Sequence, residues 1–441
     1  MKRNKKKQTK SKKLYVVSDL HIGGEGLLNT FEAKPEFLSF LKTLRQEARK
    51  YEIELVIAGD FIDFWDFQNI YGLKRLKHTT EKFKLLFEAI RQTGEKIKIT
   101  LIPGNHDHDL ACEKQYVEAL KNFNVDLKQV EYLNRTINGK KIRIEHGNQM
   151  SSFNRFENFK SKEEKPYGYY IYRNIVKKIV DAAGQNKKKR RWLADLPRFH
   201  YPYTMTPRWF LSNYFYHELA MILKIIAAPF MLLFTASLLV FFLAIASRLR
   251  LINIPDVFYF TNFLGPVKYL ANIIIIYNFI SLFLVSLFWF LFKIVKRDVI
   301  KNLSDYGIQV NKQEIKRIKD HYLIKIRQFF KINPDYDIFI FGDTHKALLK
   351  KTKVGGKAKI IANSGAWNKF FHIVKSWSLL PSVCVPYYDL SYLVIDFNQN
   401  QARIRLKHIE KRASYRLTLL QRIAIAFRKR DVAKQEKTIS I

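Results

Sequence analysis

The stretch LYVVSDLHIGG, residues 14–24, predicts the fold of this chain. It opens with a short apolar run containing two valines and ends in Ser-Asp, the pattern of a strand followed by a loop. The pattern recurs in ELVIAGD (54–60) and IKITLIPGNHD (97–107), and apolar residues at helical spacing separate the strands, in residues 35–50 and 80–92. Alternation of strand and helix is typical of an α/β sheet whose loops at the strand ends collect polar residues.

Strand character is interrupted and then returns near the end of the chain. KIRIEHG (141–147) predicts a strand after a turn at Asn138-Gly139. Residues from about 148 to 335 are then helical, aromatic and basic. We therefore expect one α/β domain with halves at 14–147 and 336–409, separated by a helical insertion at 148–335. The later strands are predicted in DIFIFGDTH (337–345), KIIANSG (359–365), SYLVIDF (391–397) and ARIRLKH (402–408).

Two segments of the insertion, 225–246 and 271–292, are apolar and contain no charged residue. Each has about the length that crosses the hydrocarbon core of a bilayer, and aromatic residues crowd the ends of both. An even number of spans would keep both halves of the domain on one side. We therefore expect a two-helix transmembrane hairpin in a multi-pass membrane protein whose catalytic domain is cytoplasmic. The alternative is a pair of buried helices in a soluble core.

The chain is strongly basic, with 77 Lys and Arg against 39 Asp and Glu and a formal net charge of +38. This charge favours anionic partners such as phospholipid headgroups, nucleotides or nucleic acid, or else it is spread over solvated faces. Residues 1–13 are expected to form a basic disordered arm. Residues 410–441 predict a basic amphipathic helix and tail that lies on a membrane surface or packs on the domain. The two cysteines lack metal or redox spacing and receive no role.

Five polar clusters stand where apolar strands end. Each alone could be a helix cap, a satisfied loop histidine or a glycine turn. Together, imidazoles, carboxylates and a carboxamide suit a pair of divalent ions such as Mn, Fe or Zn rather than Ca. Such a pair holds a phosphoryl group and activates a water molecule. The clusters are Asp19-x-His21, Gly59-Asp60, Gly104-Asn105-His106-Asp107, Glu145-His146-Gly147 and Gly342-Asp343-Thr344-His345.

In this order the clusters resemble the D-x-H, G-D-x-x-D, G-N-H-D, H and G-H-x-H signature of the calcineurin-like metallophosphoesterases. The resemblance covers residues 14–147 and 336–409 and leaves the insertion unexplained. It implies a four-layer αββα sandwich and a hydrolase that cuts phosphoester or phosphoanhydride bonds by attack of a metal-activated water. It also implies two divalent ions, Mn in the first place, with Fe, Zn or Mg as alternatives. The ligands it implies are Asp19, His21 and His345 for one ion, Asp60 as a bridge, and Asn105 and His146 for the other.

Three further residues receive roles from the same resemblance. His106, steered by Asp107, would contact the phosphate and protonate the leaving oxygen. Asp343 stands where the family usually has His. Either it is a harder ligand of the second ion, which shifts the preference of that site towards Mn or Mg, or the second ion binds weakly. Asp63 matches a supporting position of the family or caps a loop.

The segment GDFIDFWD, residues 59–66, is similar to one found in UDP-2,3-diacylglucosamine pyrophosphohydrolases. Those relatives also insert helices after the histidine of the fourth motif, but they have Arg where this chain has His106. We therefore expect a membrane-anchored phosphoesterase whose partner is a lipid-linked phosphate or pyrophosphate. One alternative is a soluble nucleotide or phosphodiester as substrate, with the helices as an anchor only. Another is a membrane-tethered binder of an anionic polymer in which the metal site is vestigial; nucleic acid is otherwise not expected as a partner.

Overall fold

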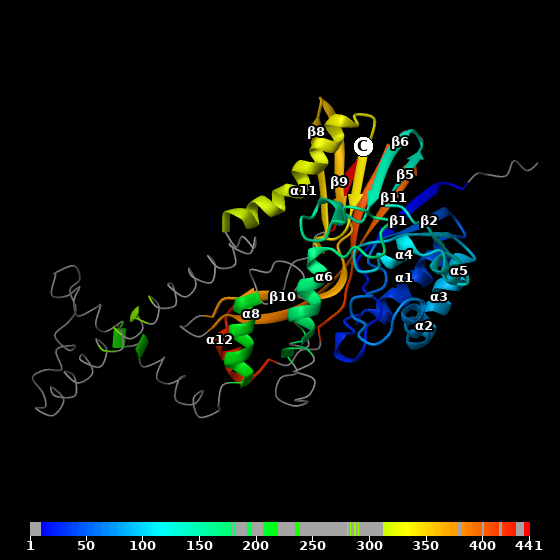
Figure 1. Ribbon diagram of the computed structural model, residues 1–441. Coiled ribbons are helices and arrows are strands. Elements are labelled where there is room, and N and C mark those ends of the chain that lie inside the picture. The colour runs from blue at the N-terminus through cyan, green and yellow to red at the C-terminus, as the bar shows by residue number, and fades with distance from the viewer. Residues whose placement is uncertain are drawn as a thin grey trace, which may run out of the picture.

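The computed structural model describes residues 10–178, 206–218, 312–376, 381–398, 401–413, 417–428 and 436–441, together with isolated residues between 180 and 290. Residues 1–9 of the predicted basic arm therefore lie outside the described residues, whereas its last two residues, Lys12 and Lys13, begin the strand β1 Lys12–Val17. Most of the predicted insertion between 179 and 311 also lies outside the described residues. The described residues include both halves of the predicted α/β domain and the two ends of the insertion (Figure 1).

Two sheets form the centre of the molecule (Figure 1). The larger has the strand order β13-β12-β11-β1-β2-β3-β4, with β10 paired to β11, and the smaller has the order β5-β6-β7-β9-β8. Strands β1 to β4 run parallel to one another, as the alternating sequence predicts, whereas β1 pairs with β11 in antiparallel fashion. The strands are β1 Lys12–Val17, β2 Glu52–Ala58, β3 Lys98–Ile102, β4 Val125–Leu127, β5 Tyr132–Ile137, β6 Lys140–Glu145, β7 Ile338–Phe341, β8 Leu348–Val354, β9 Lys357–Asn363, β10 Trp367–Val374, β11 Val383–Asn398, β12 Gln401–Ile409 and β13 Lys437–Ser440.

Helices cover the outer faces of both sheets. Those between β1 and β4 cover the larger sheet, and α11 covers the smaller one (Figure 1). The longer helices are α1 Lys34–Glu47, α2 Leu73–Lys82, α3 Lys84–Gly94, α8 Thr206–Asn213 and α11 Lys312–Ile332. The shorter ones are α4 Asp109–Cys112, α5 Gln115–Lys121, α6 Tyr167–Ile171 and α12 Leu419–Ala424, the 3₁₀ turns η1 Gly26–Leu28 and η2 Asn148–Met150, and the π-helical η3 Tyr172–Val176 and η6 Tyr214–Glu218.

The two faces of β1 show how the layers are held together. Tyr15 and Val17 belong to the core under the helices, whereas Leu14 and Val16 belong to the core between the two sheets. Successive side chains of a strand point to opposite faces, so a strand with apolar residues on both faces is buried on both sides. The resulting order of helix, sheet, sheet and helix is consistent with a metallophosphoesterase sandwich.

The two halves of the chain meet inside the smaller sheet. Strands β6 and β7 are parallel neighbours, with Ile142 opposite Ile338 and Ile144 opposite Ile340. The insertion therefore leaves the sheet after β6 and returns to it at the adjacent strand. This pairing brings the fourth and fifth polar clusters to the same edge of the sheet. Beyond the second half, β13 adds a strand to β12 at the edge of the larger sheet.

The prediction of a transmembrane hairpin, and with it of a multi-pass membrane protein with a cytoplasmic catalytic domain, is corrected by the structure. Among the described residues, no helix is both long and apolar enough to cross a bilayer. The longest, α11, has 21 residues, but charged side chains recur along its whole length, unlike the run of about 20 apolar residues that a span needs. The segments 225–246 and 271–292 lie outside the described residues apart from a few positions.

Candidate metal centre

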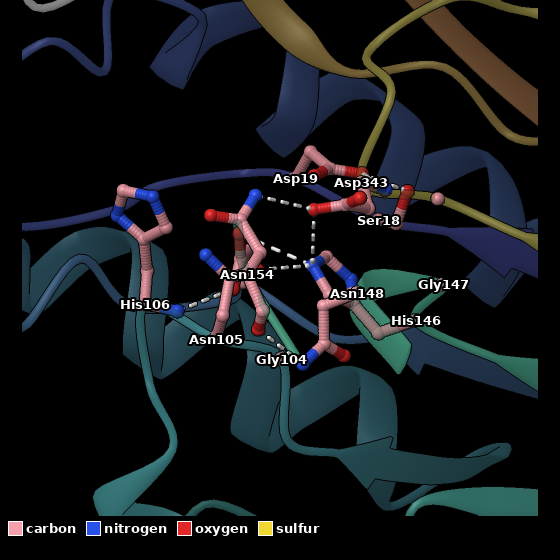
Figure 2. Close-up of polar contacts among 12 residues, drawn as sticks. Ser18, Asp19, Gly104, Asn105, His106, His146, Gly147, Asn148, Asn154 and Asp343 are labelled. Atoms are coloured by element: carbon pink, nitrogen blue, oxygen red, sulfur yellow. Dashed lines mark hydrogen bonds and ion pairs between the residues drawn. The ribbon is translucent and has the colours of Figure 1, made fainter. Parts of the chain in front are cut away.

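The predicted site residues lie together at one edge of the two sheets. They follow the carboxyl ends of β1, β2 and β3 in the larger sheet and of β6 and β7 in the smaller one. Parallel strands end at the same edge, so the loops after them converge. Figure 2 shows Asp19, Asn105, His146 and Asp343 pointing towards a common centre, with His106 to one side.

The first group consists of Asp19, His21 and His345. Nε2 of His345 lies 3.1 Å from Oδ1 of Asp19 and 3.3 Å from Nε2 of His21. In the described part of the chain this buried Oδ1 has no hydrogen-bond partner. Nδ1 of His21 lies 2.9 Å from a carboxylate oxygen of Asp63, which can only accept, so Nδ1 carries the proton and Nε2 presents its lone pair to the group. Oδ1 of Asp19 and the Nε2 lone pair of His21 are both acceptors and cannot bond to each other. A cation between them would compensate for their burial.

The second group is centred on His146. Its Nδ1 donates to the carbonyl oxygen of Ala58 at 2.9 Å, so Nε2 carries a lone pair. That lone pair faces Oδ1 of Asn105 at 3.1 Å, Oδ2 of Asp60 at 3.3 Å and Oδ1 of Asp343 at 3.9 Å. Burial opposes the charged imidazole, but Asp60 and its neighbours raise the pKa of His146 well above its usual value. The same carboxylates would favour a metal cation beside Nε2 of His146.

Asp60 lies between the two groups. Its Oδ2 is 3.7 Å from Nε2 of His21 and 3.3 Å from Nε2 of His146, whereas its Oδ1 accepts a hydrogen bond from the backbone N–H of His106 at 2.8 Å. Although burial disfavours a charge, His146 and the other histidines lower the pKa of Asp60 well below its usual value, so this carboxylate is ionised. One oxygen of Asp60 therefore reaches both groups.

The donor atoms fit a pair of divalent ions. Three buried sets each bring their potential ligand atoms within 4.8 Å of one another: Asp19 with His21 and His345, His21 with Asp60 and His106, and Asp19 with Asp60 and His146. Imidazole nitrogens mixed with carboxylate oxygens suit Mn, Fe or Zn. The sets share Asp19, His21 and Asp60, so two ions held here would be neighbours.

Residues 12–220 match the family model described as calcineurin-like phosphoesterase. This part of the chain belongs to that family. The prediction of a calcineurin-like phosphoesterase, an enzyme that hydrolyses phosphoester bonds with divalent metals, is thereby confirmed. The match extends past β6 into the insertion and ends before the second half of the sandwich. No curated protein shows significant similarity to the chain.

The candidate site is built on strained backbone. A positive φ is uncommon for residues other than glycine and costs about 1–3 kcal/mol at each position. Apart from two asparagines, the non-glycine residues with positive φ in the described chain all belong to the site. The packed loops hold these residues in an unfavourable conformation, as happens where function constrains geometry. They are Asp19 (55°), His21 (48°), Asp60 (51°), Asp343 (58°) and His345 (54°).

Two motif glycines allow the loops to approach one another. A Cβ atom on Gly59 would collide with the ring of His146. On Gly104, a Cβ atom would collide with the carboxylate and the backbone nitrogen of Asp60. Glycine is therefore required because the backbone passes within contact distance of the groups that could bind metal.

His106 is oriented by Asp63. Nδ1 of His106 lies 2.9 Å from Oδ1 of Asp63, so the expected steering partner, Asp107, is not the carboxylate that this nitrogen faces. The Asp107 carboxylate instead accepts backbone N–H groups, from Gly104 at 2.6 Å and from Phe61 at 2.8 Å. Burial, together with the charge of Asp60, raises the pKa of Asp107 to about 7. Asp107 therefore ties the loop after β3 to the loop after β2.

Aromatic side chains close one side of the candidate site. The Trp65 ring stacks on His106 with 3.8 Å between ring centroids. Tyr169 and Tyr172, from the start of the insertion, pack against Trp65 at 5.5 and 6.0 Å. These tyrosines come from outside every motif, and the sequence carries no signal that links them to the site. The match of the family model as far as residue 220 is the one indication that this segment belongs with the domain.

Asp343, the departure from the family pattern, also contacts the insertion. It accepts hydrogen bonds from the side chains of Asn154 and Tyr322. Neither residue belongs to one of the five motifs: Asn154 stands shortly after the fourth, and Tyr322 stands on α11, before the fifth. Sequence analysis missed them because a hydrogen-bond partner supplied by a distant segment leaves no local pattern.

Proposed function

We propose that this chain is a phosphoesterase that depends on two divalent ions, with Mn as the first candidate. The proposed ligands are Asp19, His21 and His345 for one ion, Asp60 as a bridge, and Asn105, His146 and Asp343 for the other. The observation that carries the proposal is the convergence of lone pairs from buried imidazole, carboxylate and carboxamide groups on two adjoining points. When bound, two such ions polarise a phosphoryl group and lower the pKa of a water molecule.

The protein itself would supply a proton to the leaving oxygen. Asp63 faces Nδ1 of His106, and Nε2 is the nitrogen that we propose acts on the substrate. Burial opposes the imidazolium, but the charges of Asp63 and Asp60 raise the pKa of His106, which favours its protonated, proton-donating form. The stacked Trp65 ring holds the imidazole plane. Asp63 and Asp107 act as positioning residues, the first on the ring and the second on the backbone beneath it.

We further propose that the two halves, 14–147 and 336–409, act as one catalytic domain and that the substrate is a lipid-linked phosphate or pyrophosphate. The pairing of β6 with β7 supports the first statement. Two features support the second: the similarity of GDFIDFWD to the diacylglucosamine pyrophosphohydrolase segment, and the aromatic wall of Trp65, Tyr169 and Tyr172 beside the proposed proton donor. A soluble nucleotide that stacks on the same aromatic wall is the second candidate.

One experiment tests both the two-ion mechanism and the lipid-linked substrate. Purified full-length chain is analysed for bound metal and assayed with Mn against lipid pyrophosphates, nucleotides, and mono- and diester aryl phosphates. The variants are Asp60→Ala and, as a control, Asp126→Ala, whose side chain is 42% exposed. We expect two ions per chain and turnover in the wild type and the control, and neither in Asp60→Ala with an unchanged circular dichroism spectrum. Undiminished turnover of Asp60→Ala would remove the mechanism, and a strong preference for nucleotides would remove the lipid assignment.

A further inference from the structure

The carboxylate of Asp343 is held on both of its oxygens by residues of the insertion. The phenol of Tyr322, on α11, donates to Oδ2 at 2.5 Å. The side-chain amide of Asn154 donates to Oδ1 at 3.1 Å, as Figure 2 shows. Both distances are those of well-formed hydrogen bonds, and the first is in the range of strong, charge-assisted ones.

The two oxygens face different surroundings. Oδ1 points to the second group and lies 3.9 Å from Nε2 of His146. Oδ2 points away from that group, towards α11. An ionised carboxylate offers about four lone-pair positions, so Oδ1 keeps one for a cation after accepting from Asn154. Because Oδ2 faces the phenol on α11, Oδ1 is the oxygen that the carboxylate presents to an ion beside His146.

The donors are themselves fixed in place. The Tyr322 ring is stacked on Phe341, with 5.9 Å between centroids and 16° between planes, and it is 7% exposed within the cluster that joins α11 to the smaller sheet. The backbone carbonyl of Asn154 accepts a hydrogen bond from Asn148 at 3.0 Å. Tyr322 and Asn154 are already held by these contacts, so they lose little conformational entropy when they bond to Asp343. The carboxylate therefore keeps one orientation.

We propose that Tyr322 and Asn154 are positioning residues that hold Asp343 as a one-oxygen ligand of the second ion and so shift that site from Zn towards harder ions such as Mn. The inference rests on the proposed metal centre and deepens it. A carboxylate oxygen favours Mn and Mg more than imidazole does. Partners that orient a ligand typically change metal affinity by about 10- to 100-fold. The insertion would then help to assemble the centre itself, in addition to bordering it.

The test measures metal binding directly, with Mn and with Zn titrated into metal-free full-length protein by calorimetry. The main variant is Tyr322→Phe, which removes the hydroxyl and keeps the ring on Phe341. Tyr336→Phe, in the same aromatic cluster, is the matched control. We expect Tyr322→Phe to weaken the second Mn site about 10-fold, to leave the first unchanged and to affect Zn less. The control should match the wild type at both sites.

A second variant, Asp343→His, isolates the carboxylate. It should raise the Zn preference of the second site, and adding Tyr322→Phe to it should then change Mn affinity little, because the phenol no longer has a carboxylate to orient. If the wild type binds two Mn ions and Tyr322→Phe binds both with unchanged affinity and selectivity, this inference is overturned while the proposed function stands. If the wild type binds no metal, both are overturned.

Discussion

Asp63 and His21 are joined by a contact of 2.9 Å between Oδ2 of the carboxylate and Nδ1 of the ring. The other oxygen of the same carboxylate lies 2.9 Å from Nδ1 of His106. One buried side chain thus selects the tautomer of two histidines, one among the candidate metal ligands and one that is the candidate proton donor. Burial opposes the charge of Asp63, but the two histidines lower its pKa, so it remains an acceptor for both.

Asp63→Asn should therefore disturb both histidines at once. The amide can offer N–H groups to the ring nitrogens, which would turn the protonated nitrogens towards the candidate metal sites. We expect metal affinity to fall by about 10- to 100-fold, with turnover falling further because His106 is also misprotonated. Calorimetric titration with Mn and steady-state kinetics measure the two effects. An Asp126→Asn control should be unchanged, and wild-type metal affinity in Asp63→Asn would show that Asp63 does not set the tautomers.

His106→Asn should reveal the proton donor through the leaving group. If His106 protonates the leaving oxygen, its loss should slow an alkyl phosphate by about 10²- to 10⁴-fold. An aryl ester such as p-nitrophenyl phosphate should be affected much less, because its phenolate leaves without a proton. His321→Asn, at an exposed position on α11, is the control. Equal losses on both substrates would assign His106 to binding instead.

Gly104→Ala tests the close approach of the loops. The added Cβ would collide with the carboxylate and backbone nitrogen of Asp60, so the loops must separate. Overpacking of this kind costs about 1–3 kcal/mol of unfolding free energy. We expect binding of both ions to weaken as well, which a metal analysis would detect. Gly139→Ala, in a turn with open space around it, should cost about 1 kcal/mol through its positive φ alone and leave metal binding intact.

Asp109, the first residue of α4, links this helix to α2 and to the insertion, and its stabilising effect should depend on pH. Its carboxylate forms ion pairs with Arg75 and with Lys165, the latter at 2.9 Å. Burial opposes the charge, but Arg75 and Lys165 lower the pKa of Asp109 below its usual value. A depressed folded-state pKa stabilises the protein above the unfolded-state pKa near 4, and that stabilisation is lost as the pH falls through the folded-state pKa.

Asp109→Asn should accordingly lower the unfolding free energy by about 3 kcal/mol at pH 7. The difference from the wild type should shrink steadily as the pH is lowered below 4, since the wild-type carboxylate then becomes neutral too. Denaturant titrations at pH 7 and at pH values below 4 measure the difference in unfolding free energy. A deficit that stays constant with pH would mean that Asp109 acts through packing and not through its charge.

The site residues could be predicted from sequence because of how parallel strands end. Each motif follows an apolar strand, and neighbouring parallel strands place their carboxyl ends at one edge. Asp19, Asp60 and Asn105 follow adjacent strands of the larger sheet, and this adjacency is implied by local order alone. The place of His345 beside these residues depends on the pairing of β6 with β7 across the insertion, which the register of Ile142 with Ile338 shows.

The transmembrane hairpin was predicted from the length of two uncharged apolar segments and from the aromatic residues at their ends, and this prediction is wrong for the described chain. A count of apolar residues measures their preference to leave water. It does not say which surface buries them or whether they form a single long helix.

The order of apolar strands and polar clusters in the amino-acid sequence predicted an α/β sheet with polar groups gathered at its strand ends, because these follow from periodicity and strand polarity. The sandwich and the candidate ligand roles were implied by the family resemblance. Tertiary structure alone decided which groups orient those residues: Asp63 and not Asp107 for His106, and Tyr322 with Asn154 for Asp343. Hydrogen bonds act over about 3 Å between groups remote in the chain, so their partners are chosen by packing.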